Sequence, residues 1–108
     1  MQEHSKRKIF ISYTTIDKEI NIDLLLEIEK KIQKFGDIYI DLLHNDNNLE
    51  PQKNVINKLT ESQLLIVINS ENIKNSKWVK IEVEIAKEKN IKTIYINVED
   101  ILNDNFKI

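Results

Sequence analysis

One carboxylate, that of Glu82, stands among apolar residues in a segment with helical periodicity. At about 100° per residue, residues 76–90 form a helix with one apolar arc, and Glu82 lies in the middle of it. The apolar arc holds Ile81, Ile85, Trp78, Ala86, Val79 and Val83. Such a carboxylate must be paired, protonated or placed at the mouth of a cleft, because uncompensated burial of a charge costs several kcal/mol. Glu82 is therefore a candidate catalytic residue; the alternative is a glutamate that binds a backbone amide or a lysine and only anchors the helix.

Several other hydroxyl and aromatic side chains stand near the predicted ends of strands and helices. Ser12 and Tyr13 end the first strand, where a hydroxyl could bind ribose or phosphate, although Ser12 could equally bond only to the following loop. Trp78, the only tryptophan, could stack on a flat ring of a ligand or simply belong to the core. Ser70 could start a turn, and Ser76 precedes the helix as an N-cap residue would.

The sequence does not support metal, thiol or phosphate-loop chemistry. The chain has no cysteine, which excludes disulfides, a thiolate nucleophile and every cysteine-ligated metal site. Its single glycine, Gly36, cannot make a glycine-rich phosphate loop. His44 begins a polar loop, residues 44–48, and we expect it to be solvated, because no metal-ligand or Ser/His/Asp spacing surrounds it. We expect no bound metal.

Length and charge balance predict one globular domain. The 108 residues carry 16 Lys and Arg against 18 Asp and Glu, so no basic surface for nucleic acid is indicated. The longest unbroken apolar run, residues 64–68, is far shorter than the roughly 18 residues of a membrane-spanning helix. No apolar stretch follows the basic N-terminal residues as it would in a signal peptide. We expect a cytoplasmic protein without a membrane partner, with a flexible tail at residues 1–7 and one domain at residues 8–108.

The elements that must position the candidate residues alternate between strand and helix. Apolar and β-branched runs predict strands at residues 8–13, 38–40, 64–68 and 92–97. Helical periodicity predicts helices at residues 17–35, from Pro51 onward and at 76–90, with Gly36 as the C′ residue of the first. This order predicts a doubly wound, three-layer α/β/α fold with a parallel sheet of four to five strands. Residues 106–108 are at most a stub of the fifth strand, and ligands are expected beyond the carboxyl ends of the strands.

Two motifs resemble the Toll/interleukin-1 receptor (TIR) domain family. Residues 8–19 read KIFISYTTIDKE, which is similar to the family's first strand and its following loop with Asp. The second motif, S-x5-S-x-W-x3-E, is matched by Ser70, Ser76, Trp78 and Glu82. Asp41 stands at the end of the second strand, where the family often has Asp. The resemblance covers about residues 8–98.

The resemblance implies a flavodoxin-like sheet and, in many members, cleavage of the nicotinamide–ribose bond of NAD⁺. The family's products are nicotinamide with ADP-ribose or a cyclised ADP-ribose. The glutamate four residues after the tryptophan is catalytic in enzymatic members, which is Glu82 here. The expected substrate-binding residues are Ser12, Tyr13, Asp41, Ser70 and Trp78. NAD⁺ is then the substrate and no cofactor is needed, because a carboxylate beside the ribose can stabilise an oxocarbenium-like transition state without a general acid.

The chain also departs from the family pattern. Its loop at residues 42–50 lacks the glycine often found there, and the last part of the domain is shortened to residues 101–108. That loop usually governs self-association, so the expected self-association residues are His44, Asn45, Asp46, Asn47 and Asn48. We expect the chain to act by TIR–TIR homo-oligomerisation or with a separate partner or effector chain. The alternative to an enzyme is a non-catalytic TIR scaffold that recruits other TIR domains.

Overall fold

The computed structural model describes residues 7–45 and 49–108 and contains one four-stranded sheet, all of it parallel. The spatial order of the strands is β2-β1-β3-β4. Their bounds are Lys8–Ser12 for β1, Asp37–Ile40 for β2, Leu64–Asn69 for β3 and Lys92–Asn97 for β4. All four predicted strands are confirmed, and with them the flavodoxin-like α/β fold.

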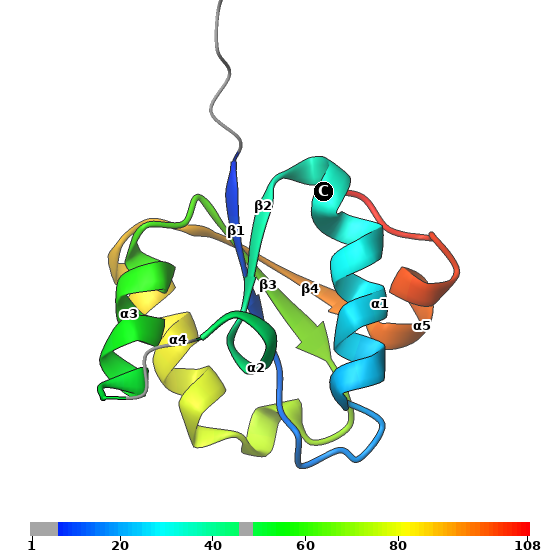
Figure 1. Ribbon diagram of the computed structural model, residues 1–108, viewed down its shortest axis with the longest axis horizontal. Helices are drawn as coiled ribbons and strands as arrows, with labels where there is room; N and C mark the ends of the chain where they lie inside the picture. The colour runs from blue at the N-terminus through cyan, green and yellow to red at the C-terminus, as the bar shows by residue number, and fades with distance from the viewer. Residues whose placement is uncertain (1–6, 46–48) are drawn as a thin grey trace, which may run out of the picture.

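Helices cover both faces of the sheet and complete three layers (Figure 1). On one side lie α3 (Pro51–Thr60) and α4 (Lys77–Glu88), and on the other lie α1 (Ile22–Ile32) and α5 (Val98–Leu102). The short helix α2 (Asp41–His44) follows β2 directly, and two 3-10 helices, η1 (Gln33–Phe35) and η2 (Ile73–Asn75), complete the described elements. Pro51 is the first residue of α3, as predicted, because its fixed φ suits that position and its missing N–H has no helical partner there.

Two apolar clusters lie between the sheet and the helices on its two faces. Successive side chains of a strand point to opposite faces, so they belong to different clusters. Ile9 and Ile11 of β1 face the α1 and α5 side, whereas Phe10 faces the α3 and α4 side. The apolar residues of β3 are all buried, which confirms that its continuous apolar run is covered on both faces. Together the two clusters pack the helices against the two faces of the sheet. The loops at the carboxyl ends of the strands remain available for a binding site.

The first helix is shorter than predicted. It begins at Ile22 instead of residue 17, because the Asn21 side chain accepts a hydrogen bond from the Leu24 amide and caps the helix there. At the other end, Gly36 does not adopt the left-handed conformation expected of a C′ residue; its backbone is extended. It is required for another reason: a Cβ atom at this position would lie 2.2 Å from the carbonyl oxygen of Arg7.

The C-terminal segment differs from the prediction as well. Residues 106–108 form no stub of a fifth strand; α5 follows β4 at once, and the chain then runs back over α1. Phe106 packs edge-on against Phe35, with 6.0 Å between the ring centroids, so apolar burial replaces strand pairing. Within the described part of the chain, no helix is long and apolar enough to cross a bilayer.

Candidate active site

Helix α4 presents Glu82 to the interior of the protein. The Ser76 side chain accepts a hydrogen bond from the Val79 amide at 3.2 Å, which confirms Ser76 as the N-cap and fixes where the helix begins. From that start the helical period buries Val79, Glu82 and Ala86 on one face. Ile81 was expected on the apolar arc but is 44% exposed, because it lies at the edge of the arc beyond the reach of the sheet. Glu82 itself is only 4% exposed.

The partner of Glu82 is Ser12, the last residue of β1. The Ser12 hydroxyl donates a hydrogen bond to Oε1 of Glu82 at 2.5 Å, and both residues are buried. A hydroxyl bound to a carboxylate at this distance is a charge-assisted contact. The carboxylate is therefore held by a side-chain hydroxyl, and within residues 7–45 and 49–108 no backbone amide or lysine bonds to it.

Burial raises the pKa of Glu82 from its ordinary 4.5 to about 7. The Ser12 hydroxyl opposes this rise because it stabilises the charged form, the nearby Asp41 carboxylate adds to it, and the Trp78 side chain opposes it. Near neutral pH the carboxyl group is thus poised between its two protonation states. Titration in this range is typical of catalytic carboxyl groups.

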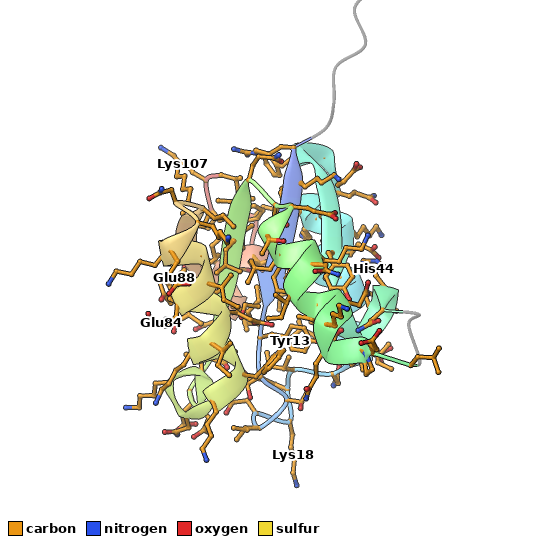
Figure 2. All side chains as sticks on the ribbon, turned by 90° about the vertical axis from the view of Figure 1, so that its left-hand side faces the viewer. Tyr13, Lys18, His44, Glu84, Glu88 and Lys107 are labelled. Carbon is orange, nitrogen blue, oxygen red and sulfur yellow. The ribbon has the colours of Figure 1, made fainter. Side chains whose placement is uncertain are left out.

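Glu82 lines a cavity of about 310 Å³ at the carboxyl ends of β1 and β2, which we call the Glu82 cavity. Its other lining residues are Ile11, Tyr13, Thr14, Thr15, Asp41, Leu42, Ser76 and Trp78. In the view of Figure 2, Tyr13 lies between the ribbons of α4 and α3. The structure therefore brings together five residues predicted from the sequence: Ser12, Tyr13, Asp41, Trp78 and Glu82. Thr14, Thr15 and Leu42 were not among the predicted substrate-binding residues, because a loop or a four-residue helix has no periodic pattern that shows which side a residue faces.

Tyr13 holds the far wall of this cavity in place. Its hydroxyl oxygen accepts a hydrogen bond from the Leu42 amide at 2.9 Å, which ties the end of β1 to α2. Burial raises the pKa of Tyr13 to about 12, the Leu42 amide lowers it, and the Asp41 and Glu82 carboxylates raise it. The phenol is therefore neutral at physiological pH, and its own proton remains available for a hydrogen bond to a ligand.

Asp41 belongs to a polar network at the end of β2. Its Oδ1 atom accepts from the Tyr39 hydroxyl at 3.2 Å and from the Asn45 side-chain amide at 2.7 Å. Asn54 of α3 donates to Oδ1 of Asn45 at 3.0 Å and thereby connects the network to the next helix. Burial, and after it the Asp41 carboxylate, raises the pKa of Tyr39. Because several elements share these contacts, the Asp41 carboxylate is fixed in position.

His44 does not lie solvated in a loop, as the sequence suggested. It ends α2, and its Nδ1 atom accepts a hydrogen bond from the Ile40 amide at 2.8 Å. Its Nε2 atom therefore carries the proton and donates to the Glu29 carboxylate at 2.6 Å. Of the predicted self-association residues, His44 and Asn45 are thus tied into the fold, and Asp46, Asn47 and Asn48 lie outside the described residues.

Of the five predicted substrate-binding residues, Ser70 is the one that the structure places elsewhere. It lines a larger cavity of about 750 Å³ together with residues that include Glu19, Asn69 and Asn97, on the α1 and α5 side of the strand ends. Its Oγ atom is buried and makes no hydrogen bond of ordinary geometry within the described part of the chain. The Ser70 hydroxyl, followed by the Asn72 amides, lowers the pKa of the Asp17 carboxyl. Ser70 thus belongs with the loop after β1 rather than with Glu82.

The smaller Glu82 cavity is the candidate active site, because among the described residues only Glu82 combines a buried carboxylate, a raised pKa and a position on a cavity wall. The larger cavity is lined by acidic and amide side chains without such a group. Across the described ranges, no three His, Asp or Glu side chains are grouped closely enough to hold a metal ion. The arrangement suits stabilisation of a cationic centre, in which the carboxylate supplies the negative charge and hydroxyls bind a polar ligand.

Comparison with known proteins identifies the family of the chain. The family model for the TIR-like domain of Thoeris protein ThsB matches residues 10–102, which include every candidate residue of the Glu82 cavity. No curated protein matches the chain. The chain belongs to the family of the TIR-like domain of Thoeris protein ThsB.

Proposed function

We propose that this protein cleaves the nicotinamide–ribose bond of NAD⁺ and that Glu82 is the catalytic residue. The observation that carries the proposal is the buried Glu82 carboxylate, bound by Ser12 and facing a cavity at the strand ends. Membership of the ThsB family supports a role in bacterial defence, and the TIR resemblance supplies the reaction. The site supports it independently, because a buried anionic group such as the Glu82 carboxylate stabilises positive charge far better than one in water.

The reaction needs one group from the protein at the reacting carbon. The C–N bond between nicotinamide and ribose breaks, and its electron pair leaves with nicotinamide, which neutralises the positive charge of the ring. The ionised Glu82 carboxylate stabilises the oxocarbenium-like charge left on the ribose. Water then adds to give ADP-ribose and releases a proton, or a nucleophilic atom of the same molecule adds to give a cyclised product.

The neighbours of Glu82 position the substrate for this step. The Ser12 bond fixes which carboxylate oxygen faces the cavity, because it occupies Oε1. The Trp78 side chain lines one wall of the cavity and limits the space that the nicotinamide ring can occupy. The neutral Tyr13 phenol can donate to a ribose or amide oxygen. A cationic substrate also favours the ionised form of Glu82, because an adjacent positive charge lowers the pKa of a carboxyl group.

Nicotinamide release from NAD⁺ by the purified protein tests this proposal. We expect release above that of a protein-free control, over a wide range of protein concentrations, with ADP-ribose or a cyclised isomer formed in equal amount. Absence of nicotinamide release at every concentration, from protein that melts cooperatively, would leave the non-catalytic scaffold as the function.

A further inference from the structure

A second cavity adjoins the Glu82 cavity. It measures about 220 Å³ and is lined by Asp41, Asn45, Pro51, Gln52, Val55 and Trp78. Asp41 and Trp78 line both cavities, so the two cavities lie next to each other at these residues. The Glu82 cavity alone, at about 310 Å³, is at the lower end of the size of small-molecule sites, roughly 300 to 1,000 Å³, and is small for a whole dinucleotide.

The lining of the second cavity combines the groups that bind a nucleoside. Trp78 offers an aromatic surface for a base, and Pro51 and Val55 are apolar. Gln52 carries both a donor and an acceptor, which matches the edge of adenine. Asp41 uses Oδ1 for Tyr39 and Asn45, whereas its Oδ2 atom makes no hydrogen bond to another described residue. This Oδ2 oxygen can accept from ribose hydroxyls.

We propose that the second cavity binds the adenosine half of the substrate, with Trp78 against the base, Gln52 at its edge and Asp41 on the ribose. This assignment rests on the proposed function, and it adds a binding site for the half of NAD⁺ that does not react. No lysine or arginine of residues 7–45 and 49–108 lines either cavity. The base and ribose therefore supply the affinity, and the phosphates add little.

Trp78 gives a direct readout, because it is the only tryptophan in the chain and lines the second cavity. We expect adenosine to change its fluorescence saturably, and adenosine monophosphate to bind no more tightly than adenosine. Gln52→Phe, which fills the cavity, should weaken adenosine binding at least tenfold. Gln52→Met, of similar size but without the amide, should weaken it by a smaller factor. Lys53→Phe, the next residue and exposed, is the matched control and should stay within twofold of wild type.

A saturable response that is equally strong in Gln52→Phe would overturn the assignment, and so would no saturable response at all. Nicotinamide release measured on the same proteins separates this inference from the proposed function. NAD⁺ cleavage without Gln52-dependent adenosine binding would overturn the adenosine site alone. Gln52-dependent adenosine binding without NAD⁺ cleavage would overturn the proposed reaction and leave a nucleoside-binding site. If both proposals hold, Gln52→Phe should raise the KM for NAD⁺ at least tenfold with a smaller change in kcat.

Discussion

The Ser12 hydroxyl binds the Glu82 carboxylate at 2.5 Å although 70 positions of sequence separate the two residues. This contact joins the end of β1 to the middle of α4 and lowers the pKa of Glu82 against the larger opposing effect of burial. The hydrogen bond and the low exposure of Glu82 act in opposite directions on its pKa. Loss of the Ser12 hydrogen bond should therefore change the pH dependence of activity, and loss of the buried carboxyl group should change the pH dependence of stability.

Ser12→Ala should raise the pKa of Glu82 above about 7, because it removes a hydrogen bond that favours the ionised form. A hydrogen bond to a charged group is worth about 1.5 to 3 kcal/mol, or roughly one to two pKa units. The acidic limb of the pH profile of kcat/KM should move upward by that amount. Ser62→Ala is the matched control, because Ser62 is also buried but bonds to the Lys58 carbonyl. Equal profiles for wild type and Ser12→Ala would show that the contact does not tune Glu82.

Glu82→Gln should make stability less dependent on pH. In wild type the unfolded chain ionises Glu82 near 4.5 and the folded chain near 7, so the free energy of unfolding falls as pH rises between these values. The fall attributable to this group is at most about 3 kcal/mol, and it levels off above pH 7. Glutamine removes it while its amide oxygen can still accept from Ser12. Denaturant unfolding at pH 4.5, 6 and 8 should show the variant gaining stability over wild type with rising pH. A constant difference would mean that burial does not raise this pKa.

Gly36→Ala should destabilise the fold by roughly 1 to 3 kcal/mol, because the added Cβ would meet the Arg7 carbonyl oxygen at 2.2 Å. That oxygen also accepts the Asp37 amide at 2.7 Å, where β1 and β2 begin to pair. Thermal melting measures the loss, with Gln33→Ala, an exposed position in η1, as the control. Since the φ of Gly36 is one that any residue adopts, an unchanged melting temperature would show that the backbone shifts without cost.

Activity should rise more steeply than linearly with protein concentration if the loop at residues 44–48 of one chain completes the active site of another. A weak dimer or larger oligomer forms only at high protein concentration, so the dilute monomer would be inactive. Specific activity over about a hundredfold range, together with light scattering, measures this. A variant with Asn47 and Asn48 replaced by Ala should lose the dependence, and Asn45 is kept because it holds Asp41. Constant specific activity in a monomeric sample would contradict a shared site.

Periodicity was enough to predict most of the fold and the position of Glu82. The unbroken apolar run of β3 predicted a strand covered on both faces, and the helical arc placed Glu82 on the buried face of α4. Helix α2 was missed, because its four residues are held by contacts that are not periodic. Its bond from the Leu42 amide to Tyr13 spans 29 positions, and its bond between His44 and Glu29 spans 15.

Spacing also cannot decide on which side of a sheet a strand-end residue lies. Ser12 ends β1 and Ser70 directly follows β3, and the TIR resemblance implied that both bind the substrate. The structure places Ser12 there and Ser70 at the larger cavity on the other side. The twist of the sheet and the path of each loop determine this, and both depend on packing between distant elements.

The rate of nicotinamide release from NAD⁺ by wild type, Glu82→Gln and Glu84→Gln, at equal protein concentration, tests the central claim most directly. Glu84 lies two residues along the same helix and is exposed, so its variant removes a helix carboxylate outside the Glu82 cavity. We predict that Glu82→Gln loses activity by at least a hundredfold while melting cooperatively, and that Glu84→Gln keeps the wild-type rate. NAD⁺ cleavage by Glu82→Gln at the wild-type rate would contradict the assignment of Glu82 as the catalytic residue.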